Sequence, residues 1–203
     1  MRKKAKERPS LLIIDMVKDN FDKEKHLPIT TFAEKIIEPL NKLKTVFREK
    51  GWPIVFATDA FHEQDFIFTG KMKPHSLKGS TGAEIIDELE RKEEDLWIEK
   101  PRFSAFFRTD LDQWLKNREV TLCAVAGITT PFCVLATALD AICWDFKAVI
   151  LEDCTAAASK KIHEQTLEIY RRSALYPLLK VASSSQLLVE LSSSDESGFA
   201  AGS

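Results

Sequence analysis

The chain has 203 residues, with 29 Lys or Arg against 31 Asp or Glu, so its formal net charge at pH 7 is −2. This near balance gives no electrostatic reason to expect a nucleic-acid partner. The length suits one large domain with a full sheet in its core. We expect that domain to cover residues 1–191, and the small, polar stretch 192–203 to be a disordered tail.

The cysteines and the amino terminus bear on cellular location. None of the 4 cysteines has CxxC spacing, which indicates a reducing compartment and not a disulfide framework. In the basic start, MRKKAKERP, we see a solvated tail, because the apolar run that follows is too short for a signal peptide. No later run is long enough to span a bilayer. These features predict a soluble, cytoplasmic protein without a membrane partner.

Strand and helix patterns alternate along the chain. Continuous apolar runs, typical of strands buried on both faces, are Leu11–Ile14, Pro53–Ala57, Leu96–Glu99, Val120–Ala126, Ala148–Leu151 and Leu178–Ala182. Helical patterns occupy Phe32–Lys50, Gly82–Leu89, Thr109–Lys116, Pro131–Asp145, Lys160–Arg171 and Gln186–Leu191. Because strands separated by helices form right-handed crossovers, we expect an α/β fold. Its form is a three-layer α/β/α sandwich with a mostly parallel, doubly wound, six-stranded sheet.

Capping signals support the starts of three helices. Thr31 with Glu34, and Thr81 with Glu84, have the spacing of capping boxes. In the third helix Thr130 is the expected N-cap and Pro131 takes the first helical position. Cys133 then lies in the first turn, near unpaired N–H groups and the positive end of the helix dipole. Both effects favour a thiolate.

Four strands deliver chemical groups to their carboxyl ends, which share one edge of a parallel sheet. The first three strands end at Asp15, Asp59 and Lys100, and the fourth leads into the turn to Cys133. Since no histidine lies at an equivalent strand end, Asp15 is the candidate base for the thiol. Lys100 can hold that carboxylate and lower the thiol pKa. Backbone N–H groups of the turn can hold a tetrahedral oxyanion, unless the Thr130 hydroxyl already caps the Cys133 N–H.

The other cysteines and a histidine fit ordinary packing or surface positions. Cys154 follows the fifth strand and is the rival nucleophile, although no helix start presents it. Cys123 and Cys143 are interpreted as packing residues, and His163 as a surface residue.

Five segments in this order resemble one family: LLIIDMVKDNF, KPHSLKGSTGAEI, IEKPRFSAFF, AGITTPFCVLATALDA and VILEDCTAA. Together they are similar to the isochorismatase-like cysteine hydrolases, which include nicotinamidases and carbamoylsarcosine amidases, over roughly residues 11–182. The resemblance implies a Rossmann-like fold with a catalytic triad of Asp15, Lys100 and Cys133. It also implies a cis peptide at Ile128–Thr129, whose turn directs the N–H groups of Thr129 and Cys133 at the oxyanion.

The same resemblance implies an activity. Isochorismatase itself lacks the cysteine, so Cys133 favours hydrolysis of a C–N bond in a small amide, imide or carbamoyl compound through a thioester. We expect no cofactor, a small-molecule amide as partner, and a homo-oligomer, either a dimer or a tetramer. Two other classes stay open: a non-catalytic binding or regulatory protein on this fold, and a redox-active thiol protein, against which the missing CxxC counts.

The sequence departs from the family at the metal site. Nicotinamidases hold a divalent ion with Asp-x-His and a later histidine, but here the stretch is Asp59-Ala60-Phe61-His62. His75 matches the later ligand, and two ligands make a poor site. We therefore favour no metal and expect Asp59 and His75 to form a hydrogen-bonded pair. A metal-dependent nicotinamidase that uses Asp59, His62 and His75 remains the alternative.

The long connection from residue 61 to residue 81 is a candidate lid or pocket wall. An apolar pocket for the substrate is predicted from Phe21, Phe61, Phe103 and Phe106. Arg102 is expected to pair with a substrate carboxylate or with an acidic neighbour such as Asp110.

Overall fold

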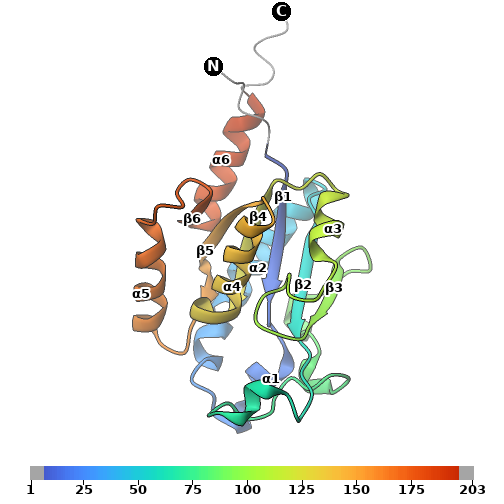
Figure 1. Ribbon diagram of the computed structural model, residues 1–203. Coiled ribbons are helices and arrows are strands. Elements are labelled where there is room, and N and C mark those ends of the chain that lie inside the picture. The colour runs from blue at the N-terminus through green and yellow to red at the C-terminus, as the bar shows by residue number, and fades with distance from the viewer. Residues whose placement is uncertain (1–6, 197–203) are drawn as a thin grey trace, which may run out of the picture.

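The structure, a computed structural model that describes residues 7–196, is built on one sheet of six parallel strands (Figure 1). The strands are β1 (Pro9–Ile14), β2 (Ile54–Asp59), β3 (Leu96–Lys100), β4 (Leu122–Ile128), β5 (Lys147–Ala156) and β6 (Leu179–Ala182). They lie in the order β3-β2-β1-β4-β5-β6, and every neighbouring pair is parallel. The predicted fold class is confirmed. Most of both predicted tails, residues 1–6 and 197–203, lies outside the described range.

Helices cover both faces of the sheet (Figure 1). They are α1 (Lys18–Phe21), α2 (Thr30–Glu49), α3 (Leu111–Lys116), α4 (Leu135–Cys143), α5 (Lys160–Arg171) and α6 (Ser184–Glu196). Helices α2 and α6 contribute to one buried apolar cluster, and α3, α4 and α5 to a second. Within residues 7–196, no helix has both the length and the apolar character needed to cross a bilayer.

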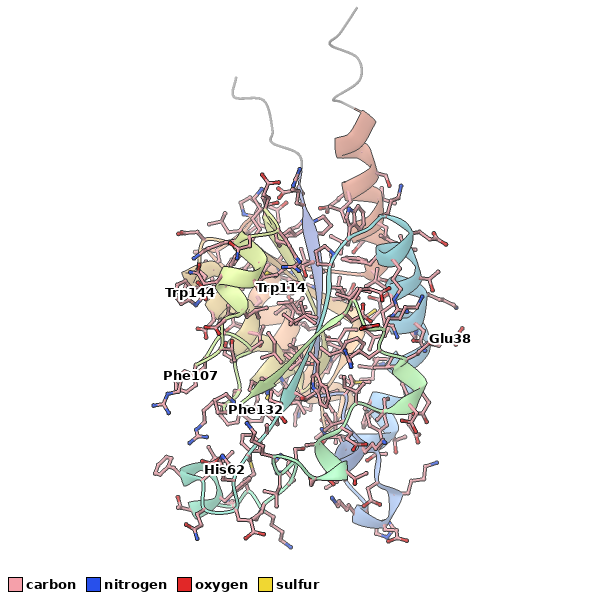
Figure 2. All side chains as sticks on the ribbon, turned by 90° about the vertical axis from the view of Figure 1, so that its right-hand side faces the viewer. Glu38, His62, Phe107, Trp114, Phe132 and Trp144 are labelled. Carbon is pink, nitrogen blue, oxygen red and sulfur yellow. The ribbon has the colours of Figure 1, made fainter. Side chains whose placement is uncertain are left out.

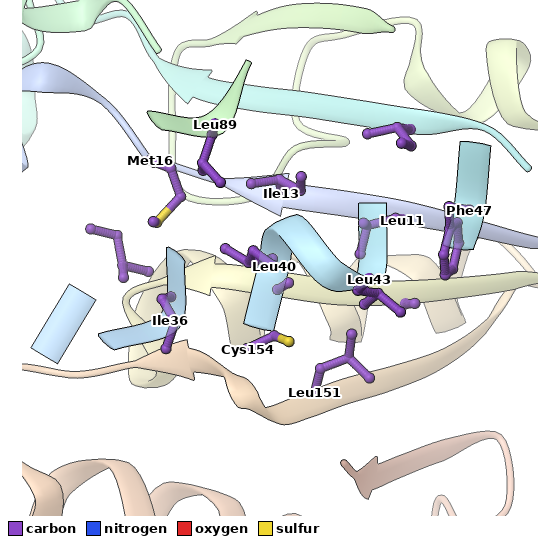
Figure 3. Close-up of a cluster of buried hydrophobic side chains, with 14 of the residues drawn as sticks. Leu11, Ile13, Met16, Ile36, Leu40, Leu43, Phe47, Leu89, Leu151 and Cys154 are labelled. Carbon is purple, nitrogen blue, oxygen red and sulfur yellow. The ribbon is translucent and has the colours of Figure 1, made fainter. Parts of the chain in front are cut away.

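The central strand β1 supplies both clusters because its side chains alternate between the two faces. Leu11 and Ile13 belong to the cluster under α2, and Leu12 and Ile14 to the cluster under α4. Figure 3 shows the first pair beside apolar residues of α2, among them Leu40, Leu43 and Phe47. A strand buried on both faces explains the unbroken apolar run in the sequence.

The strand order reverses between β1 and β4, and the carboxyl ends of these strands lie at this switch point. Parallel open sheets bind their ligands at such a position. Gly127 allows the two strands to approach closely there. Its φ is +101°, and a Cβ on it would lie 2.1 Å from the carbonyl oxygen of Ile14.

The helix predicted at Gly82–Leu89 is wrong. This segment holds only two single 3-10 turns, Thr81–Ala83 and Asp87–Leu89. Its backbone between them is bound to the chain after β1: the Lys18 N–H donates to the Glu84 carbonyl at 2.9 Å, and the Ile86 N–H donates to the Met16 carbonyl at 3.1 Å. Because those groups are paired across the two segments, they are not free for a helix.

Two other helix boundaries differ from prediction. Helix α2 begins at Thr30, with Ile29 as its N-cap, so Thr31 does not cap it. The turn before it already starts the helix, since the Thr30 N–H donates to the Leu27 carbonyl at 3.1 Å. Helix α6 runs from Ser184 to Glu196, into the stretch expected to be disordered. Its apolar residues Leu187 and Leu191 pack in the core and anchor it.

Candidate active site

Three charged side chains from neighbouring strands meet at the carboxyl edge of the sheet. Asp15 follows β1, Asp59 ends β2 and Lys100 ends β3. The Lys100 Nζ donates to Asp15 Oδ2 at 2.9 Å and also to Asp59 Oδ1. The backbone N–H of Asp59 donates to Asp15 Oδ1 at 2.8 Å. These bonds hold two carboxylates around one ammonium whose residue is completely buried.

The thiol of Cys133 completes this group. Its sulfur and one carboxylate oxygen from each of Asp15 and Asp59 all lie within 4.8 Å of one another. Cys133 is buried but still reaches solvent, with 7% of its surface exposed. The structure therefore brings together Asp15, Lys100 and Cys133, the residues predicted to be catalytic, and places Asp59 beside them.

The turn that presents Cys133 differs from the predicted helix start. Thr130–Val134 form one π-helical turn, and α4 begins only at Leu135. The N-cap residue is Thr129 and not Thr130, and the peptide bond Ile128–Thr129 is cis. Single π-helical turns occur frequently at functional sites.

The sequence left open whether the Thr130 hydroxyl caps the Cys133 N–H. In the structure it does not. It lies 2.9 Å from Nδ1 of His163 on α5. His163, expected at the surface, is half-buried by this contact. Leu167, four residues later, is buried in the core, so the helical spacing between the two was the sequence signal that His163 faces inward.

Burial and charge determine the protonation state of the thiol. Burial raises the pKa of Cys133 well above its ordinary value, the negative charge of Asp15 raises it further, and Lys100 offsets only part of this. The preference for a thiolate that the helix start creates is therefore outweighed at this site. A helix start and one ammonium do not outweigh the loss of hydration and two adjacent carboxylates.

The other two ionisable groups respond to the same surroundings. Burial raises the pKa of Asp59 to about 7, and the charge of Asp15 contributes to the increase. Burial by itself lowers the pKa of Lys100, but the charges of Asp15, Cys133 and Asp59 outweigh it and raise the pKa above the ordinary value. Lys100 is therefore an ammonium throughout the physiological range.

The three metal-ligand candidates do not converge. Asp59 is bound to Lys100, the exposed His62 donates its backbone N–H to Asp65 at 2.9 Å, and His75 Nδ1 lies 2.9 Å from the Lys73 carbonyl. The expected pair of Asp59 with His75 is also wrong. Parallel pairing of β2 with β3 puts Lys100 directly beside Asp59. The Asp59 carboxylate therefore accepts a hydrogen bond from Lys100 and not from His75.

Phe61, which stands where the family's first histidine ligand is expected, belongs to an aromatic cluster. It is 1% exposed, and its ring centroid lies 5.4 Å from those of Phe68 and His75. Among the described residues, the one group with metal-ligand spacing is Asp15, Asp59 and Cys133, whose carboxylates are already bound to Lys100. The donor set of a nicotinamidase-type divalent metal is thus not assembled here.

Three of the predicted pocket residues are packing residues. Phe61 lies in the aromatic cluster, Phe21 packs against the core under α2, and Phe106 is 5% exposed with its ring stacked on Phe146. Their apolar character fits a core as well as a pocket; Phe61 and Phe106 are buried, and Phe21 is half-buried against the core.

Arg102 and Phe103 directly follow the carboxyl end of β3. The Arg102 guanidinium donates to Asp65 at 3.2 Å and not to Asp110, the neighbour named from sequence. The Phe103 ring lies 6.1 Å from that of Phe132, the residue before the thiol. Phe132 is 59% exposed at this edge of the molecule (Figure 2). Phe132 was not among the predicted pocket residues, although its position next to Cys133 was a signal.

The remaining cysteines do not compete with Cys133. Cys154 is fully buried in the cluster under α2, and Cys133 belongs to the opposite cluster. Cys123 is buried in β4, as expected for packing. Cys143 was predicted to pack inside its helix but is exposed, because α4 ends at that residue.

Comparison with known proteins adds independent evidence. Residues 9–182 match the model of the isochorismatase domain. A protein of Arabidopsis thaliana, named a probable inactive nicotinamidase, is 32% identical over 165 residues, which are 76% of this chain and 83% of that protein. The ureidoacrylate amidohydrolase RutB of Acinetobacter baylyi is 27% identical over 188 residues, covering 80% of this chain and 77% of that one.

The fold is also similar to that of a solved structure. The crystal structure of N-carbamoylsarcosine amidase from Thermoplasma acidophilum matches with a TM-score of 0.75 and 28% identity. The match covers 87% of this chain and 96% of that one. The family model spans every strand of the sheet and the residues at its carboxyl edge. The protein therefore belongs to the isochorismatase family of hydrolases.

Proposed function

We propose that this protein is a cysteine amidohydrolase that cleaves the C–N bond of a small amide, imide or carbamoyl compound. The observation that carries the proposal is the meeting of Asp15, Lys100 and Cys133 at the switch point of the sheet. The names of the relatives support the substrate class, since they include a ureidoacrylate amidohydrolase and a carbamoylsarcosine amidase.

In the first half of the reaction, the Asp15 carboxylate takes the proton from the Cys133 thiol as the sulfur attacks the carbonyl carbon. The carbonyl π electrons move onto the oxygen, and the backbone N–H groups of Thr129 and Cys133, in the turn that follows Ile128, stabilise this oxyanion. The tetrahedral intermediate then collapses and the C–N bond breaks. Asp15 gives its proton to the leaving nitrogen, and a thioester remains on Cys133.

In the second half, water attacks the thioester while Asp15 accepts one of its protons. Collapse of the second intermediate breaks the C–S bond, releases the carboxylic or carbamic acid, and returns a proton to the sulfur. Lys100 stays protonated throughout and holds the Asp15 carboxylate at its working position. The raised pKa of Cys133 fits this scheme, because the thiol keeps its proton until Asp15 removes it during attack.

The alternative of a metal-dependent nicotinamidase receives no support from the residues present. Asp59 is bound to Lys100, and Phe61 replaces a histidine. The proposed reaction therefore uses no metal ion. A purely redox role is also disfavoured, since Cys133 lies 10 residues from Cys123 and Cys143 and has no CxxC partner.

Trapping the acyl-enzyme tests this function directly. The purified protein is incubated with a panel of small amides, ureido acids and nicotinamide, and release of ammonia is measured. With a hydrolysed substrate, acid quenching followed by peptide mass spectrometry should show the acyl group on the peptide that contains Cys133. Ammonia release without any adduct on Cys133, or with the adduct on Cys143, would contradict the proposed mechanism.

A further inference from the structure

Thr130, the first residue of the turn that carries Cys133, is hydrogen-bonded to a residue of helix α5. Thr130 is completely buried, and its hydroxyl lies 2.9 Å from Nδ1 of His163. A buried hydroxyl without a partner is costly, so this contact favours one orientation of the turn. Cys133 is three residues further along the same π-helical turn.

The imidazole of His163 has a second partner. The backbone carbonyl of Glu152, in β5, also acts on the ring and favours an N–H directed toward it. Because a backbone carbonyl only accepts, the ring N–H is directed to Glu152 and the Nδ1 lone pair is left for the Thr130 hydroxyl. A neutral imidazole thus connects β5, α5 and the turn that presents the thiol.

We propose that Thr130 and His163 are positioning residues that hold the Cys133 sulfur in line with Asp15. The inference rests on the proposed amide hydrolysis and deepens it by adding two residues that do not contact the substrate. Loss of the bond lets the turn relax, and the sulfur moves relative to its base. A displacement of about 1 Å at a reacting atom can lower the rate by roughly a hundred-fold.

The hydrogen bond between Thr130 and His163 also depends on pH. Burial lowers the pKa of His163, and the Glu152 carbonyl acts in the opposite direction. The charged groups that act on the ring are Glu164 and Arg171 from α5 and Glu152 from β5, while the Thr130 hydroxyl is the contact from the π-helical turn. The imidazolium formed in acid has no lone pair at Nδ1, so the Thr130 hydroxyl loses its acceptor.

The test compares Thr130→Val, which removes the hydroxyl, with His163→Phe, which removes the acceptor. His163→Gln is the rescue variant, since an amide can accept from Thr130 and donate to Glu152. Thr166→Val is the matched control: its hydroxyl is bonded within the same helix, to the Ile162 carbonyl at 2.8 Å. All variants are made in a Cys143→Ser background, because the exposed Cys143 would otherwise react with alkylating reagents.

We expect Thr130→Val and His163→Phe each to lower kcat by about ten- to a hundred-fold with KM nearly unchanged, because the sulfur is displaced but the pocket is not. The double variant should be little worse than either single one. His163→Gln should recover most of the rate and show no loss of activity in the pH range where the wild-type histidine becomes charged. Wild-type kcat in both single variants, or equal effects of Thr166→Val, would overturn the proposal.

Alkylation by iodoacetamide gives a readout that does not need a substrate. The rate at Cys133, followed by peptide mass spectrometry, should rise in Thr130→Val and His163→Phe and not in Thr166→Val, because the turn no longer holds the sulfur in its buried position. If the wild type hydrolyses no amide, the proposed function fails while this comparison still decides the positioning role. Equal alkylation rates in all variants would then refute it.

Discussion

At the scale of single residues, the site is defined by three acidic groups around one ammonium. Asp15, Asp59 and the Cys133 thiol all lie close to Lys100, and groups of like charge at such distances cannot all ionise at low cost. The protein therefore keeps protons on some of them at neutral pH, as the raised pKa values of Cys133 and Asp59 indicate. A neutral thiol beside a carboxylate base is the resting state that we infer.

Replacing the nucleophile should abolish turnover without unfolding the protein. In Cys133→Ala the removed atom is one sulfur, and Cys154, near the carboxyl end of β5, is buried in the cluster on the opposite face of the sheet. We expect kcat to fall by roughly 10³-fold or more, as for other covalent catalysts. Far-UV circular dichroism should be unchanged, and Cys143→Ala should keep wild-type activity. Loss of activity in Cys154→Ala, with Cys133→Ala still active, would contradict the assignment.

Asp15 and Lys100 should behave as one unit. Asp15→Asn removes the base, and Lys100→Met removes the ammonium that holds it, so each should abolish most activity. Because both act on the same proton transfer, the double variant should be little worse than the single ones. The measurement is kcat/KM for the four proteins of the cycle. Additive losses would mean that the two residues act in separate steps.

Lys100→Met should also lower stability, because it leaves buried carboxylates without their counter-ion. Breaking a buried ion pair on one side typically costs about 3–5 kcal/mol. Urea unfolding at pH 8 is the measurement, and Lys78→Met is a suitable control, since the Lys78 pair with Glu99 is largely exposed. Similar urea midpoints for the two variants would show that water reaches the buried cluster.

The pH dependence of stability should reveal the carboxyl of Asp59. Burial raises its pKa to about 7 in the folded protein, so between its ordinary value of 3.8 and 7 the folded state binds more protons than the unfolded one. The contribution of the Asp59 carboxyl to the free energy of unfolding is therefore greatest in acid and declines as the pH rises toward 7. We expect the wild type to lose stability relative to Asp59→Asn between pH 4 and pH 8, measured by urea unfolding. A constant difference would place the Asp59 pKa outside this interval.

At the scale of elements, the site depends on the contact of β1 with the end of β4. Asp15 follows the one strand, and the turn to Cys133 follows the other. Gly127 is paired with Ile14 across this contact. A side chain between the two strands would separate the base from the thiol.

Gly127→Ala tests this contact. Its Cβ would lie 2.1 Å from the Ile14 carbonyl oxygen, whereas at Gly51, which also has a positive φ, a Cβ meets nothing within 4 Å. Gly51→Ala should cost about 1–2 kcal/mol from backbone strain alone. Gly127→Ala should cost clearly more and should also lower kcat, as urea unfolding and amide hydrolysis can show. Equal losses of stability in the two variants would mean that β4 shifts freely against β1.

At the scale of the whole molecule, the loops above the sheet decide the cofactor requirement. The connection from residue 61 to residue 81 packs Phe61 with Phe68 and His75 and does not direct histidines to Asp59. Loops of this kind vary while the scaffold below them stays the same. We therefore expect hydrolysis on this sheet to proceed without a metal ion.

Treatment with a strong chelator should leave amide hydrolysis unchanged. Among the described residues, the one group with metal-ligand spacing is Asp15, Asp59 and Cys133, and Lys100 already neutralises its carboxylates. The experiment compares metal content and kcat before and after dialysis, and again after addition of zinc, manganese or iron. Near-stoichiometric metal, with activity lost on chelation and restored by an ion, would contradict this prediction and return nicotinamide to the leading substrate.

Much of the fold and of the site could be predicted because their signals are local in the chain. Unbroken apolar runs indicated buried parallel strands, and parallel strands place their carboxyl ends at one edge, which was enough to bring Asp15, Asp59 and Lys100 together. The helix at residues 82–89 was wrong although its capping pattern was good. Backbone bonds to the segment after β1 outweighed that local preference, since propensity is a weak term beside tertiary contacts.

What only the tertiary structure decided are properties that depend on neighbours distant in the sequence. The register of β2 with β3 gave Asp59 the partner Lys100 in place of His75. Burial and the neighbouring carboxylates raise the pKa of Cys133, although a helix start alone favours the thiolate. The Thr130 hydroxyl found His163 on another helix. A sequence pattern specifies which groups reach an edge of the sheet, but pairing and ionisation depend on distances and hydration, which exist only once the chain has packed.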